Sequence, residues 1–343
     1  MEASMVVDEV ESLEDIRRLL VGAPGPDLDA GEQADRREAQ LTKPPGSLGR
    51  LEDLARWLSL WQGRHPPTMD RPAARLFAGN HGVARQGVSA FPAAVTAQMV
   101  SNFLAGGAAI NQLCRALSVS FSADAIELDR PTADFTEAAA MTEAEFLAAF
   151  NRGMVSVDRT MDVLALGEMG IGNTTAAAAL ACGLFGGAAA DWTGPGTGLV
   201  GAELAHKTKV VERAVARHRD AAGDPLELMR RLGGRELAAI AGAVTAARLL
   251  RVPVVLDGFI CTAAAAPLGL VDPGALDHCQ AGHVSAEPGH RRLLSVLNKE
   301  PLLNLGLRLG EGSGAVLAIA VLRAAVACHT GMATFAEAGV ATP

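Results

Sequence analysis

The sequence has 343 residues and a formal net charge of −8 at pH 7; hydrophobic residues make up 49% of it and aromatic residues only 4%. This length suits one large domain or a large domain with a smaller companion, and the composition favours a core of small aliphatic side chains over a disordered chain. An acidic chain gives no basis for contact with a phosphate backbone, so no nucleic acid is expected as a partner.

The cysteines and the apolar segments indicate a cytoplasmic protein. Five cysteines are scattered without a CxxC pair, which is typical of buried thiols in a reducing compartment. The acidic N-terminal residues lack the apolar centre of a signal peptide. The stretch 252–271 is long enough to span a membrane, but it contains Asp257, two prolines and two glycines. We therefore expect a buried strand followed by a helix there, and no membrane contact.

The first segment of the chain is predicted to be helical. Residues 51–61, LEDLARWLSLW, have the apolar spacing of an amphipathic helix and follow the loop KPPGSLG at 43–49. The proline-rich stretch 66–72, PPTMDRP, predicts a linker, so the preceding residues are not expected to join a sheet. The last predicted helix covers residues 313–328 and is expected to return to the N-terminal helices.

From residue 73 onward, short apolar runs alternate with longer helical patterns. The predicted strands are 75–78, 121–128, 163–166 and 252–256, and the predicted helices are 93–117, 174–184, 202–218 and 236–250. Such alternation predicts an α/β fold with a mostly parallel sheet that is covered by helices on both faces. Because ligands bind outside the carboxyl ends of strands in open α/β sheets, the glycine and polar residues after each strand are the candidates for chemistry.

The segment 167–175, GEMGIGNTT, follows a predicted strand and opens a predicted helix. Gly172, Asn173 and Thr174 lie where free backbone N–H groups and the positive end of a helix dipole can bind an anion. A tight turn with Thr174 as an ordinary helix cap is the alternative. The spacing matches neither the dinucleotide fingerprint nor the nucleoside-triphosphate loop.

A second glycine-rich turn, TGPGTG at 193–198, leads into the helix that carries Lys207. Gly194, Gly196 and Gly198 can form a concave set of N–H groups, and a lysine ammonium can add a point charge to a phosphate. Two anion sites of this kind suit a substrate with a phosphate and a carboxylate. A flexible loop beside a solvated lysine is the alternative.

Two acidic residues are candidates for chemistry. Glu311 lies in RLGEGSGA, at the start of an apolar helix, where partial burial would raise its pKa and make it a better base near neutral pH. Asp257 ends an apolar strand and needs a partner there. The alternatives are a helix-capping glutamate and a cap for the helix that follows Asp257.

The histidines do not predict a metal site. His81, His283 and His290 lie in GNHGV and GHVSAEPGH, but their spacing matches no usual zinc pattern. Hydrogen-bonding or structural roles are therefore expected, and no metal.

Seven segments, taken together and in order, are specific. They are KPPGSLGRLE at 43–52, GNHGV at 79–83, GVSAFP at 87–92, GEMGIGNTT at 167–175, LDGF at 256–259, GHVSAE at 282–287 and RLGEGSGA at 308–315. This set resembles the nicotinate-nucleotide–dimethylbenzimidazole phosphoribosyltransferase family, and the match extends over nearly the whole chain.

The resemblance implies a fold and a reaction. The fold is a Rossmann-like, mostly parallel sheet domain at 67–310, with a small helical domain formed from both chain ends, 1–66 and 311–343. The reaction transfers the phosphoribosyl group of nicotinate mononucleotide to 5,6-dimethylbenzimidazole and releases nicotinate and α-ribazole phosphate, in cobalamin nucleotide-loop synthesis. A homodimer whose partner helps to close each site is also implied, and no metal or organic cofactor.

The resemblance also implies roles for residues. Glu311 matches the general base that takes the proton of the attacking benzimidazole nitrogen, and Glu168 matches a second glutamate that gives positioning or electrostatic support. Nicotinate leaves with a neutral nitrogen and needs no acid. The residues expected near the nucleotide and its phosphate are Gly172, Asn173, Thr174, Gly194, Gly196, Gly198, Asp257, Ser285 and Lys207, with Lys209 as the alternative to Lys207.

The benzimidazole pocket is expected to draw on Ser89, Phe91, Pro92 and Met99. This chain has Asn80 where many relatives have aspartate, and Phe91 where they have tyrosine or serine. The resemblance therefore does not determine which base the protein accepts. Three alternatives are weighed: a different acceptor base, a non-catalytic nucleotide-binding homologue, and a dinucleotide-dependent oxidoreductase. The missing fingerprint at 75–82 disfavours the last, and the intact Gly-Glu-Gly-Ser-Gly disfavours the second.

Overall fold

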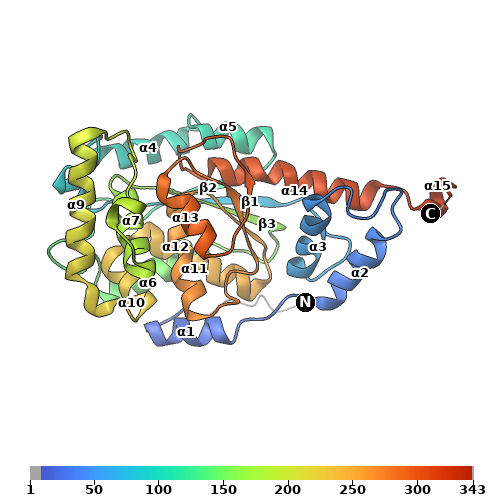
Figure 1. The fold of residues 1–343 in the computed structure, drawn as a ribbon, viewed down its shortest axis with the longest axis horizontal. Helices are drawn as coiled ribbons and strands as arrows, with labels where there is room; N and C mark the ends of the chain where they lie inside the picture. The colour runs from blue at the N-terminus through green and yellow to red at the C-terminus, as the bar shows by residue number, and fades with distance from the viewer. Residues whose placement is uncertain (1–8, 342–343) are drawn as a thin grey trace.

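The computed structural model describes residues 9–341, which form a parallel sheet between two layers of helices (Figure 1). The sheet has six strands in the order β2-β1-β3-β4-β5-β6, and every neighbouring pair is parallel. The predicted α/β class is therefore confirmed. The strands are β1 (Pro72–Ala78), β2 (Ser120–Ala125), β3 (Val163–Met169), β4 (Val254–Leu256), β5 (Cys279–His283) and β6 (Pro301–Leu303).

Helices cover both faces of this sheet because successive side chains of a strand point in opposite directions. In β3, Leu164 and Leu166 join the core under α6, α11 and α12, whereas Val163 and Ala165 join the core under α3, α5 and α14. The helices are α1 (Leu13–Val21), α2 (Leu28–Glu38), α3 (Arg50–Gln62), α4 (Ala94–Ala105), α5 (Ala109–Ala116), α6 (Glu143–Val155), α7 (Asn173–Phe185), α8 (Ala189–Trp192), α9 (Gly201–Arg217), α10 (Pro225–Leu232), α11 (Arg235–Leu250), α12 (Phe259–Val271), α13 (Pro288–Val296), α14 (Ser313–Gly331) and α15 (Phe335–Ala338), with 3-10 turns η1 (Gly82–Gln86) and η2 (Arg219–Ala221).

The structure corrects two expectations about these elements. The helix expected over 93–117 is interrupted, because Gly106 ends α4 in the left-handed region (φ +78°) and α5 starts after Gly107. Strands β5 and β6 were not predicted, since CQAGH and PLL are short and lack an apolar alternation. The apolar stretch 252–271 is a buried strand followed by a helix, as expected.

The two chain ends meet beside the sheet. α3 packs on α14, the Arg37 Nε donates a hydrogen bond to the His329 carbonyl at 2.7 Å, and Leu41 pairs with Thr334. α1, by contrast, lies apart from α2 and α3 and contacts α12 under the α/β body (Figure 1). The predicted division into a small helical domain, 1–66 and 311–343, and a sheet domain, 67–310, stays a prediction. α1 lies within 1–66 but packs on α12 of the sheet domain.

By length and composition alone, α14 could cross a membrane, since its mean hydropathy is 1.6 over 18 residues. Its environment is that of a core helix, because it contacts β3, β4, β5 and α3 and its side chains Val316, Ile319 and Leu322 are fully buried. α14 starts at the carboxyl ends of the strands and runs toward the chain ends (Figure 1).

α6 and α11 touch through their backbones. A Cβ atom added at Gly153 would overlap the Ala239 carbonyl, and one added at Gly242 would overlap the Phe150 carbonyl. Only glycine permits this approach between α6 and α11, and α11 in turn packs on β1 and β3.

We predict that Gly153→Ala lowers the free energy of unfolding by about 3 kcal/mol, because overpacking here moves backbone and not a flexible side chain. Urea unfolding followed by circular dichroism measures this change. Gly331→Ala is the matched control, since the new Cβ in α14 meets nothing within 4 Å. Equal urea midpoints for Gly153→Ala and the unmodified chain would contradict the prediction.

Candidate active site

A cavity of about 440 Å³ opens at the carboxyl ends of the strands. It is lined by segments that follow β1, β3, β4, β5 and β6, which is where ligands bind in open α/β sheets. The predicted site residues that line it are Glu168, Asn173, Thr174, Gly196, Asp257, Ser285, Glu311, Phe91 and Met99. The structure thus brings together residues that are up to 220 positions apart in the sequence.

Six predicted residues do not line the cavity: Gly172, Gly194, Gly198, Lys207, Ser89 and Pro92. Gly172 starts α7 with a φ of +97° and faces His81, and Gly194 faces the Glu287 carboxylate. Ser89 bonds the Thr197 hydroxyl at 3.0 Å, and Thr197 itself lines the cavity. These residues shape the cavity wall and do not form its surface.

Glu311 is a buried carboxyl group held on a strained backbone. Its φ is +64°, between Gly310 at +83° and Gly312 at +81°. This loop lies directly on β3, where a Cβ atom at Gly167 would come within 2.7 Å of the Glu311 backbone. Glu311 Oε2 has no hydrogen-bond partner within residues 9–341. Burial, with the nearby Asp257 charge, raises the pKa of Glu311 to about 7, which suits a proton acceptor.

Asp257, and not Glu311, holds the start of α14. Its Oδ2 accepts from the Gly312 N–H at 3.2 Å and its Oδ1 from the Ala315 N–H at 2.9 Å. It therefore caps α14, not the α12 helix that follows it in sequence. This bond pair fixes the position from which Glu311 enters the cavity.

Glu168 is the second buried carboxyl group. Burial raises its pKa to about 8, and the charges of Asp257 and Glu236 act in the same direction. The Asn173 side chain donates a hydrogen bond to Glu168 Oε2, and a Cβ atom at Gly310 would overlap Oε1. Glu168 therefore lies against the Glu311 loop and carries a proton at neutral pH.

Behind Glu168, His81 Nε2 and Glu236 Oε1 form a buried pair at 2.5 Å. The pair is packed against Gly79, Gly170 and Gly234, where any side chain would collide with it. Sequence reasoning predicted a hydrogen-bonding His81 but missed Glu236, because a glutamate at the start of a helix gives no signal of burial.

The glycine turn at 193–198 contacts a carboxylate of the protein itself, that of Glu287. The Gly196 N–H donates to Glu287 Oε1 at 3.0 Å. Lys207 lies fully buried beneath the turn, where its Nζ donates to the Thr174 hydroxyl and the Gly194 carbonyl, both at 2.9 Å. Burial lowers the pKa of Lys207 to about 8. Lys209 is exposed, so Lys207 is the lysine at the turn.

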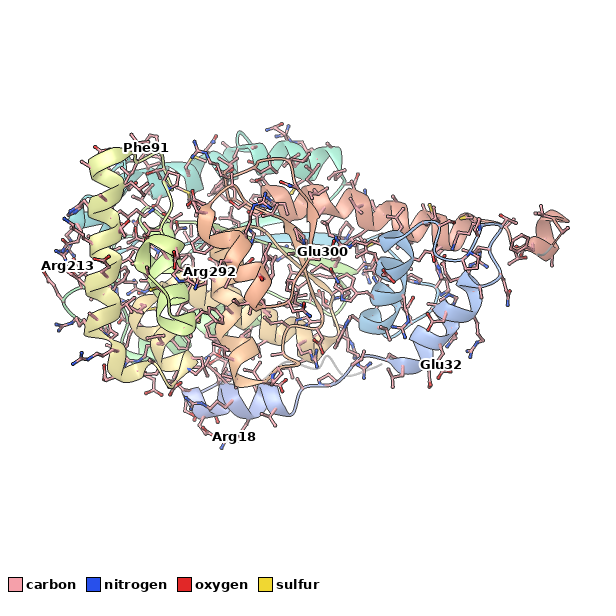
Figure 2. All side chains as sticks on the ribbon, viewed as in Figure 1. Arg18, Glu32, Phe91, Arg213, Arg292 and Glu300 are labelled. Carbon is pink, nitrogen blue, oxygen red and sulfur yellow. The ribbon has the colours of Figure 1, made fainter. Side chains whose placement is uncertain are left out.

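The cavity is lined by an apolar group and a polar group of side chains, here called its apolar end and its polar end, and the two meet where the Thr197 hydroxyl contacts Ser89 and the Ala90 N–H. Phe91, Val95 and Met99 form the apolar end, and Phe91 lies near the start of α9 (Figure 2). At the polar end, Arg308 donates to the Gly196 carbonyl at 3.1 Å, beside Glu287. Arg308, Glu287 and His283 are lining residues that sequence reasoning did not select, although all three lie in segments that it singled out.

The chain is similar to known proteins over almost its full length. A family model described as phosphoribosyltransferase matches residues 23–340. Proteins named nicotinate-nucleotide–dimethylbenzimidazole phosphoribosyltransferase from Ruegeria pomeroyi and Sinorhizobium fredii are 62% and 58% identical; the alignments cover 96% and 95% of this chain and 97% and 96% of those proteins. The crystal structure of CobT from Thermus thermophilus superposes with a TM-score of 0.85 at 43% identity, over 92% of this chain and all of that one.

We predict that Glu287→Gln strengthens the binding of inorganic phosphate about tenfold, because the variant removes the negative charge that competes for the Gly196 N–H. Isothermal titration calorimetry at constant ionic strength measures it. Glu300→Gln is the control, since this glutamate is 76% exposed and lies away from Phe91 on the surface (Figure 2). Unchanged or weaker binding by Glu287→Gln would show that the carboxylate supports the turn and does not compete with a ligand.

Proposed function

The chain belongs to the nicotinate-nucleotide–dimethylbenzimidazole phosphoribosyltransferase family, and from this premise we propose how the cavity performs the reaction. The protein transfers the 5-phosphoribosyl group of nicotinate mononucleotide to 5,6-dimethylbenzimidazole, giving α-ribazole 5′-phosphate and nicotinate for cobalamin synthesis. The observation that carries our assignment of residues is Glu311, whose Oε2 has no partner among residues 9–341 and which lines a cavity together with apolar side chains and with Gly196, Thr174 and Arg308.

In the proposed reaction, the flat dimethylbenzimidazole ring lies at the apolar end, with Phe91 and Met99. One ring nitrogen attacks the anomeric carbon of the donor with its lone pair, and the other transfers its proton to Glu311. The bond between that carbon and the pyridinium nitrogen breaks, and its electron pair stays on the nitrogen of nicotinate. Proton loss to Glu311 keeps positive charge from accumulating on the acceptor ring.

Glu168 supports this step as a neutral group. Because its raised pKa keeps it protonated near neutral pH, it adds no second negative charge beside Glu311. With Asn173 it holds the floor of the cavity, and we assign it positioning and no proton transfer to the leaving group. Nicotinate departs with a neutral ring nitrogen and needs no acid.

We place the donor phosphate at the polar end, near Gly196 and Thr174, with Ser285 beside it. Arg308 reaches the rim of this end, and the buried Lys207 supplies positive charge from beneath the turn. Gly172, Gly194 and Gly198 shape the turn and the start of α7, and Asp257 acts through α14. Ser89 and Pro92 then position the Phe91 wall and do not contact the acceptor.

We also infer a cytoplasmic homodimer that works without nucleic acid or membrane. The inference rests on the family resemblance and on exposed apolar side chains such as Leu104 and Val200 beside the cavity helices. A mass of twice 35.4 kDa in solution tests the dimer.

The direct test combines the purified protein with nicotinate mononucleotide and 5,6-dimethylbenzimidazole, without added metal. Nicotinate and ribazole phosphate are expected in equal amounts, followed by chromatography and mass spectrometry. A second candidate function is transfer to a different acceptor, because the apolar Phe91 lines the part of the cavity that we assign to the acceptor. Adenine and phenols in place of the benzimidazole test it. A folded protein that gives no product with any acceptor would support a non-catalytic homologue instead.

We predict that Glu311→Gln lowers kcat by about 10²- to 10⁴-fold and leaves donor binding nearly unchanged, because the amide cannot accept the proton.

For the unmodified enzyme, the base must be ionised, so kcat/KM should rise about tenfold per pH unit up to about pH 7. Above about pH 8, Lys207 loses its charge and the KM for the donor should rise.

Glu300→Gln serves as the charge-matched control for this variant, and circular dichroism checks that both remain folded. Turnover of Glu311→Gln within threefold of the unmodified enzyme would remove Glu311 from its assigned role. A flat pH profile between pH 5 and 8 would do the same.

A further inference from the structure

His283 is a buried polar side chain that faces the cavity without a partner of its own. It is the last residue of β5, it lines the cavity, and only 1% of it is exposed. Neither ring nitrogen forms a hydrogen bond with any residue that the structure describes. Because buried polar groups are nearly always hydrogen-bonded, a ring that lacks partners and lines a cavity is a candidate to bind a ligand.

The neighbouring His290 shows the contrast. Its Nδ1 accepts from the Ser285 N–H at 2.8 Å, and its Nε2 bonds the Thr262 hydroxyl at 3.0 Å. The two imidazole rings are only 6.3 Å apart between centroids. His290 is therefore satisfied by the protein and holds the Ser285 backbone, as expected from the sequence, whereas His283 is left with both nitrogens free.

The orientation of the His283 ring is fixed. A Cβ atom at Gly314 would overlap the ring, and one at Gly258 would come within 3.2 Å of Nε2. Nε2 lies 3.5 Å from Asp257 Oδ1, and this carboxylate favours the tautomer with the proton on Nε2. Nδ1 is then an acceptor, and a ligand satisfies it only by donating a hydrogen bond.

This requirement selects one part of the donor nucleotide, if the reaction proposed above holds. The phosphate dianion and the nicotinate carboxylate only accept hydrogen bonds, whereas the ribose hydroxyls donate. The place agrees: His283 ends β5, which pairs with the strand before Asp257, and the same segment continues to Glu287 at the glycine turn. The ribose spans this interval, because it joins the phosphate to the carbon that reacts near Glu311.

We propose that His283 accepts a hydrogen bond from a ribose hydroxyl of the donor and thereby orients the sugar for attack. His283 acts on the substrate beside the reacting carbon, and Asp257 links it to the start of α14. The benzimidazole is not its partner in the proposed reaction, because the ring has a single N–H, and Glu311 accepts that proton.

The test measures the binding of nicotinate mononucleotide and of its 2′-deoxy and 3′-deoxy analogues to the full-length protein by calorimetry. We expect the unmodified protein to bind one deoxy analogue about tenfold more weakly, the effect of one lost hydrogen bond at a buried group. His283→Ala should bind the parent nucleotide about tenfold more weakly and discriminate less than twofold. His283→Asn, whose amide oxygen replaces Nδ1, should recover part of the preference.

Several outcomes would overturn the proposal. One is equal binding of all three nucleotides by the unmodified protein, which needs no variant to be folded. Another is a preference that persists in His283→Ala, since a purely structural role weakens all donors alike. A third is that His283→Ala changes only the choice between nicotinate and nicotinamide mononucleotide, which would place the ring at the leaving group. Because no acceptor is present, these results stand apart from turnover, whose absence would contradict the proposed reaction instead.

Discussion

The active site depends on carboxyl groups that are crowded into a buried space. Glu168, Glu236, Asp257 and Glu311 are each at most 6% exposed, and together they could not all be ionised without support. Asp257 is supported by two backbone N–H groups at the start of α14, and Glu236 by His81. Glu168 accepts one hydrogen bond, from Asn173, and Glu311 Oε2 accepts none from the described residues. Burial raises the pKa of Glu168 to about 8 and that of Glu311 to about 7. Both groups therefore bind a proton more readily than an exposed carboxyl group does, and Glu311 keeps an oxygen without a partner in the described residues that can accept one.

Glycines make this crowding possible. Gly167 lets the loop before α14 lie on β3, and Gly310 and Gly312 take the left-handed conformations on either side of Glu311. Asp257 then fixes the helix that the loop enters. Gly153 and Gly242, which also lack side chains, let α6 and α11 pack in backbone contact. The first turn of α11 carries Glu236, which lies behind Glu168. Local sequence choices and the position of the reacting groups are therefore linked through backbone contact.

The sequence predicted those parts of the molecule that have a local signature. Runs such as 163–166 identify central strands, and the flanking glycines identified Glu311 as a buried carboxyl at a helix start. β5 and β6 escaped prediction because they are short and lack apolar alternation; tertiary contacts bury β5, whereas β6 at the sheet edge is only partly buried. Glu287 contacts Gly196 across 91 positions, and no spacing rule relates the two. For His283 the sequence predicted a hydrogen-bonding or structural role; that neither ring nitrogen has a partner among the described residues is visible only once the structure around it is known.

The walls of the cavity differ in what they are made of. On the side of β3 and α14, the surface is largely backbone and glycine, where a new side chain collides with Glu311 or with Glu168. On the other side, the surface consists of the Phe91, Val95 and Met99 side chains, and Phe91 is 53% exposed. Changed side chains fit more readily on the second wall than on the first. The acceptor side of the site is therefore open to redesign for another aromatic molecule without moving the backbone that holds the proton-accepting carboxyl group.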